Sequence, residues 1–140
     1  MQIAQQLHPT PATPLRVFIV EDSEAVLERL EEMVGNIAGA RFAGSATTAE
    51  AALRGINDTQ PDAVILDVRL AQGSGFDVLR ALAARALPTQ VYIFSNLATE
   101  PYRRMAQRLG AAAFFDKGSQ TEDMRALLAQ RAAQHAQQPH

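Results

Sequence analysis

The chain has 140 residues, which suits one domain of ordinary size. It carries 13 Lys and Arg against 15 Asp and Glu, a near balance that argues against a strongly basic nucleic-acid or membrane binder. The absence of cysteine excludes disulfides, thiolate catalysis and Cys-ligated zinc, and the three histidines lie near the termini. No apolar run approaches the roughly 20 residues that span a bilayer, and no secretory signal is apparent, so we expect a cytoplasmic protein.

Residues 1–14 contain three closely spaced prolines and are expected to form a disordered tail. Such a segment cannot bury enough apolar surface to offset the entropy lost when it becomes ordered. We expect a folded domain over residues 15–131. Residues 132–140, rich in Gln and Ala, are expected to continue the last helix and then fray as a C-terminal tail.

Apolar runs and helical patterns alternate five times along the domain. Continuous apolar runs at 17–20, 63–66 and 91–94 are typical of strands buried on both faces, and weaker strands are expected at 41–46 and 112–115. The segments that follow the strands show helical spacing or helix-start signals. This alternation predicts an α/β fold with a five-stranded parallel sheet and helices on both faces.

Two residue pairs predict helix starts. A Ser or Thr followed three residues later by Glu is typical of a capping box, and the chain has Thr47 with Glu50 and Ser119 with Glu122.

Reactive side chains follow four of the predicted strands. Glu21 and Asp22 follow the first strand, Asp67 the third, Ser95 the fourth and Lys117 the fifth. Ligands gather beyond the carboxyl ends of such strands, so we expect these groups to converge at one edge of the sheet. Lys117 is the only lysine among 13 basic residues, which draws further attention to this edge.

Three acidic groups brought together repel one another unless a cation lies between them. A hard divalent cation with oxygen ligands, Mg²⁺ or Mn²⁺, would fit between Asp22 and Asp67. Lys117 would offer a positive charge to phosphate oxygens and Ser95 a hydroxyl donor. A nucleophile, a metal and charge stabilisation are the parts that phosphoryl transfer requires, and Asp67 is the candidate nucleophile because no Ser, Cys or His is available at the centre.

With this set of residues, the chain resembles the receiver domain of bacterial two-component response regulators, in particular single-domain, chemotaxis-regulator-like proteins. The residue set above, the segment 61–70 ending in Asp67-Val68-Arg69-Leu70, and the segment 110–117 ending in Asp116-Lys117 carry the resemblance. It spans residues 15–131 and implies a flavodoxin-like, doubly wound (βα)5 fold.

The resemblance also implies residue roles. Asp67 would accept a phosphoryl group from a sensor histidine kinase or a histidine phosphotransfer protein. Asp22, Asp67 and the backbone carbonyl of Arg69 would bind the metal, with Glu21 helping through water. Lys117 would pair with Asp67 or its phosphate.

Signalling would depend on Ser95 and Phe114. Ser95 would move to bind the phosphate, and Phe114 would swing inward, which would reshape the face built from the fourth helix, fifth strand and fifth helix. A purely structural alternative is that Phe114 packs in the hydrophobic core. Output would pass to an unknown downstream protein or by onward phosphotransfer, without direct nucleic-acid or membrane binding and without turnover of a separate substrate. From the residues that follow Lys117, we expect no DNA-binding output domain.

Three departures from the family pattern stand out. Gly118 follows the lysine where the family usually has proline, often after a cis bond, and we expect this glycine to supply a positive φ instead. Asn96 stands where a small residue is usual. The loop at 71–75 lacks the usual proline and is expected to be more flexible.

Two other functions remain open at this stage. A phosphohydrolase with an aspartyl-phosphate intermediate would normally carry a second Asp two positions after the nucleophile, where this chain has Arg69. A receiver-like interaction module that is never phosphorylated is kept open by Asn96 and Gly118. A dinucleotide-binding domain fails because no Gly-x-Gly-x-x-Gly follows the first strand.

Overall fold

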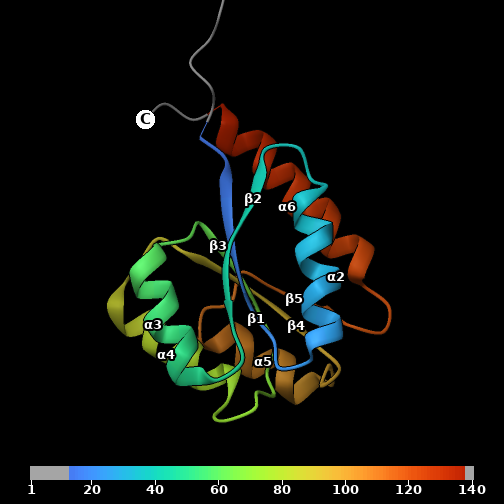
Figure 1. The fold of residues 1–140 in the computed structure, drawn as a ribbon. Coiled ribbons are helices and arrows are strands. Elements are labelled where there is room, and N and C mark those ends of the chain that lie inside the picture. The colour runs from blue at the N-terminus through green and yellow to red at the C-terminus, as the bar shows by residue number, and fades with distance from the viewer. Residues whose placement is uncertain (1–12, 138–140) are drawn as a thin grey trace, which may run out of the picture.

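A computed structural model describes residues 13–137 of the chain (Figure 1). Its strands are β1 (Leu15–Val20), β2 (Ala40–Ala46), β3 (Ala63–Leu66), β4 (Gln90–Ser95) and β5 (Ala113–Asp116). Its helices are α2 (Glu24–Gly35), α3 (Ala49–Thr59), α4 (Gly75–Arg85), α5 (Glu100–Arg108) and α6 (Thr121–Ala136). The strands pair in parallel in the order β2-β1-β3-β4-β5. This confirms the predicted α/β architecture and its flavodoxin-like, doubly wound (βα)5 topology.

The sheet is covered on both faces. α3, α4 and α5 pack on one face, and α2 and α6 pack on the other (Figure 1). Successive residues of a strand point to opposite faces, so in β1 the side chain of Phe18 joins the first layer while those of Val17 and Ile19 join the second. The central strand β3 is buried along its whole length, which explains its continuous apolar run.

The strand order fixes where the site lies. β1 and β3 are neighbours in the sheet, but the chain leaves β1 toward α2 on one face and leaves β3 toward α4 on the other. The two connections therefore diverge and leave a crevice beyond the carboxyl ends of β1 and β3. The residues that follow these two strands face this crevice.

Both predicted capping boxes are wrong. α3 is capped by Thr48, whose hydroxyl accepts from Ala51 N, so the start lies one residue beyond the predicted Thr47. α6 begins after Gln120, which makes no side-chain cap, rather than after Ser119. A capping box is present at α4, where Asp77 Oδ2 accepts from Ser74 N and the Ser74 hydroxyl accepts from Phe76 N.

The two predicted tails are described only in part. Residues 1–12 of the predicted N-terminal tail and residues 138–140 lie outside the described residues. α6 continues to Ala136, so the predicted domain limit at residue 131 falls inside this helix. Of the helices in residues 13–137, none has the length and apolarity that a membrane crossing requires.

Candidate functional site

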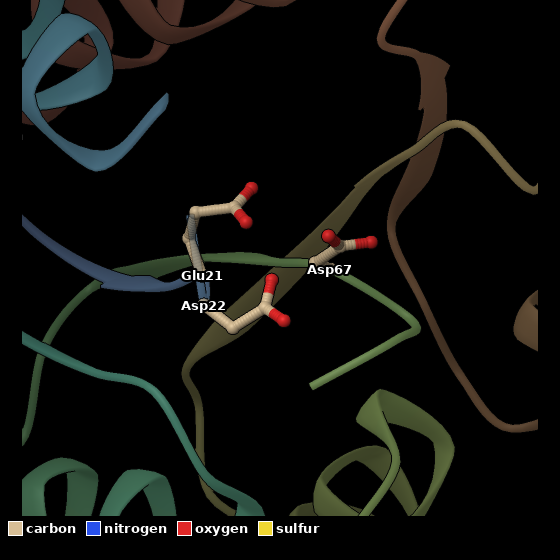
Figure 2. A group of neighbouring side chains, drawn as sticks. All are labelled: Glu21, Asp22 and Asp67. Carbon is tan, nitrogen blue, oxygen red and sulfur yellow. The ribbon is translucent and has the colours of Figure 1, made fainter. Parts of the chain in front are cut away.

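Three carboxylates from two neighbouring strands meet in the crevice. Glu21 and Asp22 directly follow β1, and Asp67 directly follows β3 (Figure 2). One oxygen from each carboxylate lies within 4.8 Å of the other two. Glu21 is 1% exposed and Asp67 6%, whereas Asp22 is exposed at the mouth of the crevice. The structure therefore brings together the acidic residues that the sequence placed at one edge of the sheet.

The ammonium group of Lys117 lies between two of these acids. Its Nζ is 2.7 Å from Asp67 Oδ2, to which it donates a hydrogen bond, and 2.6 Å from Glu21 Oε1. The contact with Glu21 differs from the sequence prediction, which gave Glu21 only a water-mediated role near a metal. Glu21 directly pairs with the lysine because its carboxylate lies deeper in the crevice than that of Asp22.

The surroundings shift the pKa of both partners. Burial raises the pKa of Glu21, although the bonds from Lys117 and Ser23 N oppose this effect. Burial would lower the pKa of Lys117, but its contacts with Asp67 and Glu21 outweigh burial and raise the pKa. Lys117 is therefore a fixed positive charge at neutral pH, while Glu21 carries a charge that the fold disfavours.

The acidic cluster fits a divalent cation. Glu21 Oε1 is a buried oxygen 2.6 Å from the Lys117 ammonium, which Asp67 also contacts, so two buried carboxylates share one cation. Lys117 offers one positive charge to three carboxylates, so negative charge is in excess there. Oxygen ligands of this type suit Mg²⁺, and Asp22, Asp67 and Glu21 have the right chemistry to hold it.

Replacing Glu21 with glutamine should stabilise the metal-free protein. A raised pKa means that the fold favours the neutral form of Glu21, and glutamine is a neutral residue of the same shape that can still accept from Ser23 N. We expect the free energy of unfolding in urea with EDTA to rise, the direction that the raised pKa implies. The exposed Glu31→Gln on α2 should change it little. A loss of stability in Glu21→Gln would show that the ion pair with Lys117 outweighs the cost of burying the charge.

Ser95 ends β4 beside the acidic cluster. It is 1% exposed, and its Oγ accepts a hydrogen bond of 3.1 Å from Leu97 N, so the hydroxyl holds the loop that follows its own strand. Ser95, Asp67 and Lys117 line one pocket of about 330 Å³. Arg69 and the exposed Asn96 also line this pocket, which places both near the acceptor carboxylate.

The loop after β3 is tied to its neighbours. Ala71 N donates to Thr47 O and Ala49 N donates to Gln72 O. Gly75 N donates to Val68 O at 2.7 Å, which draws the start of α4 against the backbone of Asp67. These hydrogen bonds supply constraints on the loop that a proline would otherwise give, and the expected flexibility at 71–75 stays a prediction.

The loop that carries Lys117 has its own fixing contacts. Residues 13–137 contain no cis peptide bond, and Gly118 does not have a positive φ, so the predicted role for this glycine is wrong. Asp116 Oδ1 instead accepts from Gly118 N at 2.8 Å. Gln120 Oε1 accepts from Asp116 N at 2.9 Å. The sequence analysis missed Gln120, which has no local signal because glutamine is not a typical capping residue.

Phe114 and Phe115 point to opposite faces of the sheet. Phe115 is buried among α2 and α6, and Phe114 is half-buried against the layer of α3, α4 and α5. The guanidinium of Arg103 on α5 lies over the ring of Phe114, 4.9 Å from its centre. The switch role of Phe114 stays a prediction.

Comparisons with known proteins agree with this geometry. A family model described as the response regulator receiver domain matches residues 17–129. The response regulator GacA of Pseudomonas aeruginosa is 26% identical over 110 residues, which are 79% of this chain and 51% of GacA. A protein-glutamate methylesterase/protein-glutamine glutaminase of Xanthomonas oryzae pv. oryzae is 36% identical over 110 residues, 77% of this chain and 30% of that protein.

Solved structures show the same fold. The signal receiver domain of the putative response regulator NarL from Mycobacterium tuberculosis has a TM-score of 0.76 at 25% identity, covering 90% of this chain and 98% of that one. The response regulator domain of Thermotoga maritima CheB has a TM-score of 0.76 at 22% identity, covering 91% and 99%. The chain spans about half the length of GacA and less of the methylesterase.

Proposed function

The chain belongs to the response regulator receiver domain family, and from this membership we propose that Asp67 accepts a phosphoryl group from a phosphohistidine. The observation that carries the proposal is the carboxylate of Asp67, which lies at the end of a buried strand with Lys117 on one oxygen and two further acids beside it. The donor would be a sensor histidine kinase or a histidine phosphotransfer protein.

The transfer exchanges one phosphorus bond for another. An oxygen of Asp67 attacks phosphorus as the phosphorus–nitrogen bond to the donor histidine breaks, and the imidazole leaves with the bonding electron pair and takes up a proton. Lys117 contacts Oδ2, so Oδ1 is the oxygen without a lysine contact. Charge on the transferred oxygens is best stabilised by groups that are already in place.

The other site residues would support this step. A bound Mg²⁺, held by Asp22, Asp67 and the backbone carbonyl of Arg69 with Glu21 nearby, would neutralise charge on the phosphoryl oxygens. Lys117 would pair with the phosphoryl oxygens once Asp67 is phosphorylated. Ser95 lines the same pocket and would turn to donate a hydrogen bond from its hydroxyl to these oxygens, which would move its oxygen away from Leu97 N.

The phosphorylated state would act through protein contacts or pass the phosphoryl group onward. We propose that Ser95 and Phe114 transmit the change to the face of α5, β5 and α6, where a downstream protein would bind. In this account the chain turns over no separate substrate, binds no nucleic acid or membrane directly, and works in the cytoplasm. The second candidate, a receiver that is never phosphorylated, is favoured only by Asn96, which lines the pocket, and by Gly118, which follows Lys117 in the sequence.

Intact mass spectrometry tests phosphoryl uptake. The protein is incubated with acetyl phosphate and MgCl2, and a parallel sample contains excess EDTA. We expect a gain of one phosphoryl group with magnesium and none with EDTA, because three unneutralised carboxylates repel an anionic donor. No gain with magnesium, from acetyl phosphate and from a phosphorylated histidine kinase alike, would favour the second candidate.

Replacing Lys117 with alanine should leave magnesium binding intact and weaken the structural response to phosphorylation. We expect the variant to fold and to retain its affinity for magnesium, since no acidic ligand is lost, but to show a reduced change at Phe114 on phosphorylation. Calorimetric titration with MgCl2 and amide NMR shifts at Phe114 would measure the two effects. Lys117→Arg should not restore the response, because a planar guanidinium does not replace a compact ammonium between two carboxylates. An unchanged response in Lys117→Ala would refute the role of the lysine.

A further inference from the structure

The side chain of Arg103 joins three segments that are distant in sequence. Its Nε donates to Ala98 O at 2.9 Å, in the loop after β4. Its Nη2 donates to Gln120 Oε1 at 3.1 Å, at the start of α6, and its Nη1 lies 3.4 Å from Phe114 O in β5. The guanidinium also lies over the Phe114 ring. One half-buried side chain on α5 thus bridges two loops and a strand.

These contacts differ from those of the neighbouring arginine. Arg104 is 63% exposed and faces Glu100 at 3.9 Å, a surface pair that contributes little. The three acceptors of Arg103 are uncharged oxygens that lie in different directions. Three separate nitrogens of the planar fork reach these acceptors, whereas a lysine would offer all its donors from one nitrogen.

The two loops that Arg103 joins are the loop that follows Ser95 and the loop that contains Lys117. Ala98 follows Leu97, whose N–H is bound by the Ser95 hydroxyl. On the other side, the oxygen of Gln120 that accepts from Arg103 also accepts from the backbone N–H of Asp116, the residue before Lys117. Hydrogen bonds, with one backbone step on each side, therefore connect both of these site residues to the same guanidinium.

The side chain of Gln120 contacts both this path and its own helix. It occupies the position before α6, where Ser, Thr, Asn or Asp would normally bind the first free N–H groups of the helix. Its side chain makes no such cap. Its amide nitrogen donates to Asp123 Oδ2 at 3.4 Å in the first turn of α6, and its oxygen is shared between Asp116 N and Arg103. The helix start forgoes the usual stabilisation, and the loop of Lys117 gains a link to α5.

We infer that Arg103 is a positioning residue that couples the loop after Ser95 to the loop of Lys117 and passes a rearrangement of either to α5 and Phe114. The inference rests on the proposed function, because phosphorylation of Asp67 is the trigger. When the Ser95 hydroxyl turns to the phosphoryl group, Leu97 N loses its acceptor and the loop at Ala98 shifts. Arg103 then follows Ala98 or releases it, and either outcome changes its contact with Phe114.

A first test needs neither metal nor phosphate. In Arg103→Ala, Gln120 Oε1 loses one of its two donors, so the amide of Asp116 should exchange hydrogen roughly five-fold faster in EDTA, the effect of about one hydrogen bond. Arg104→Ala is the matched control on the same helix and should exchange like the wild type. Arg103→Lys keeps the charge but not the fork, so it should resemble Arg103→Ala. Wild-type exchange at Asp116 in Arg103→Ala would overturn the link.

A second test reads the response to a phosphoryl mimic. With beryllium fluoride and MgCl2, wild type and Arg104→Ala should show amide shifts at Lys117, Ala98 and Phe114. Arg103→Ala should keep the shift at Lys117 and lose at least half of the shift at Phe114. Equal shifts at Phe114 in Arg103→Ala and Arg104→Ala would overturn the coupling while leaving the proposed function intact. The absence of any shift near Asp67 in the wild type would instead overturn the proposed function and, with it, the trigger of the coupling.

Discussion

Replacing Asp67 with asparagine should abolish phosphoryl uptake and leave the fold intact. An amide has no anionic oxygen to attack phosphorus, and Glu21, Asp22 and Ser95 are not expected to take over the role. Asparagine has the same shape and can still accept from Lys117 Nζ, so the circular dichroism spectrum should match the wild type. Uptake would be measured as the phosphorylated fraction by intact mass.

Asp58→Asn is the matched control. Asp58 is an exposed acid on α3, so its replacement changes the net charge by the same amount without touching the site. It should be phosphorylated like the wild type. Equal phosphoryl uptake in Asp67→Asn and Asp58→Asn would show that Asp67 is not the acceptor.

Replacing Gly75 with alanine should destabilise the protein by about 3 kcal/mol, the upper part of the usual range for an overpacked site. A Cβ at this position would lie 2.1 Å from the backbone oxygen of Asp67 and 3.0 Å from Val68 Cα. These neighbours are backbone atoms next to the acceptor residue, so they cannot move aside as a flexible side chain would. The variant should unfold at a clearly lower urea concentration.

Gly35→Ala provides the control. Gly35 is the last residue of α2, and a Cβ there would meet no atom within 4 Å, so alanine should be neutral or stabilising by up to about 1 kcal/mol.

The Gly75→Ala molecules that remain folded should also be phosphorylated more slowly, because the clash displaces the backbone of Asp67. Equal urea midpoints for the two variants would contradict the close approach of α4 to Asp67.

The strands were predictable because the physical cause of their burial is local. A parallel strand covered on both faces needs an uninterrupted apolar run, and β3 has one. Ligand sites of such sheets lie beyond the carboxyl ends of the strands. This was enough to predict that Asp67, Asp22 and Lys117 lie together, without any knowledge of side-chain positions. β2 gave a weaker signal because its residues are only partly buried and its register shifts opposite Val17 and Phe18.

The errors have equally specific causes. Thr47 and Thr48 are adjacent residues with the same capping chemistry, so the pattern alone could not choose between them. The start of α6 could not be predicted from local sequence. The Gln120 side chain accepts a hydrogen bond from Arg103, which lies 17 residues earlier in the chain. The close approach of Gly75 to Asp67 O likewise depends on how α4 meets the end of β3, which no local pattern records.

Chemical mapping of the phosphorylated residue tests the central claim most directly. The protein is phosphorylated with acetyl phosphate and MgCl2, the acyl phosphate is reduced with borohydride, and the digested peptides are sequenced by mass spectrometry. The reduction converts a phosphorylated aspartate to homoserine. We expect homoserine at position 67, with Asp22 and Glu21 unchanged. Homoserine at position 22 would contradict the assignment of Asp67 as the acceptor. The assignment would also be contradicted if the protein gains phosphate but no aspartate is converted to homoserine.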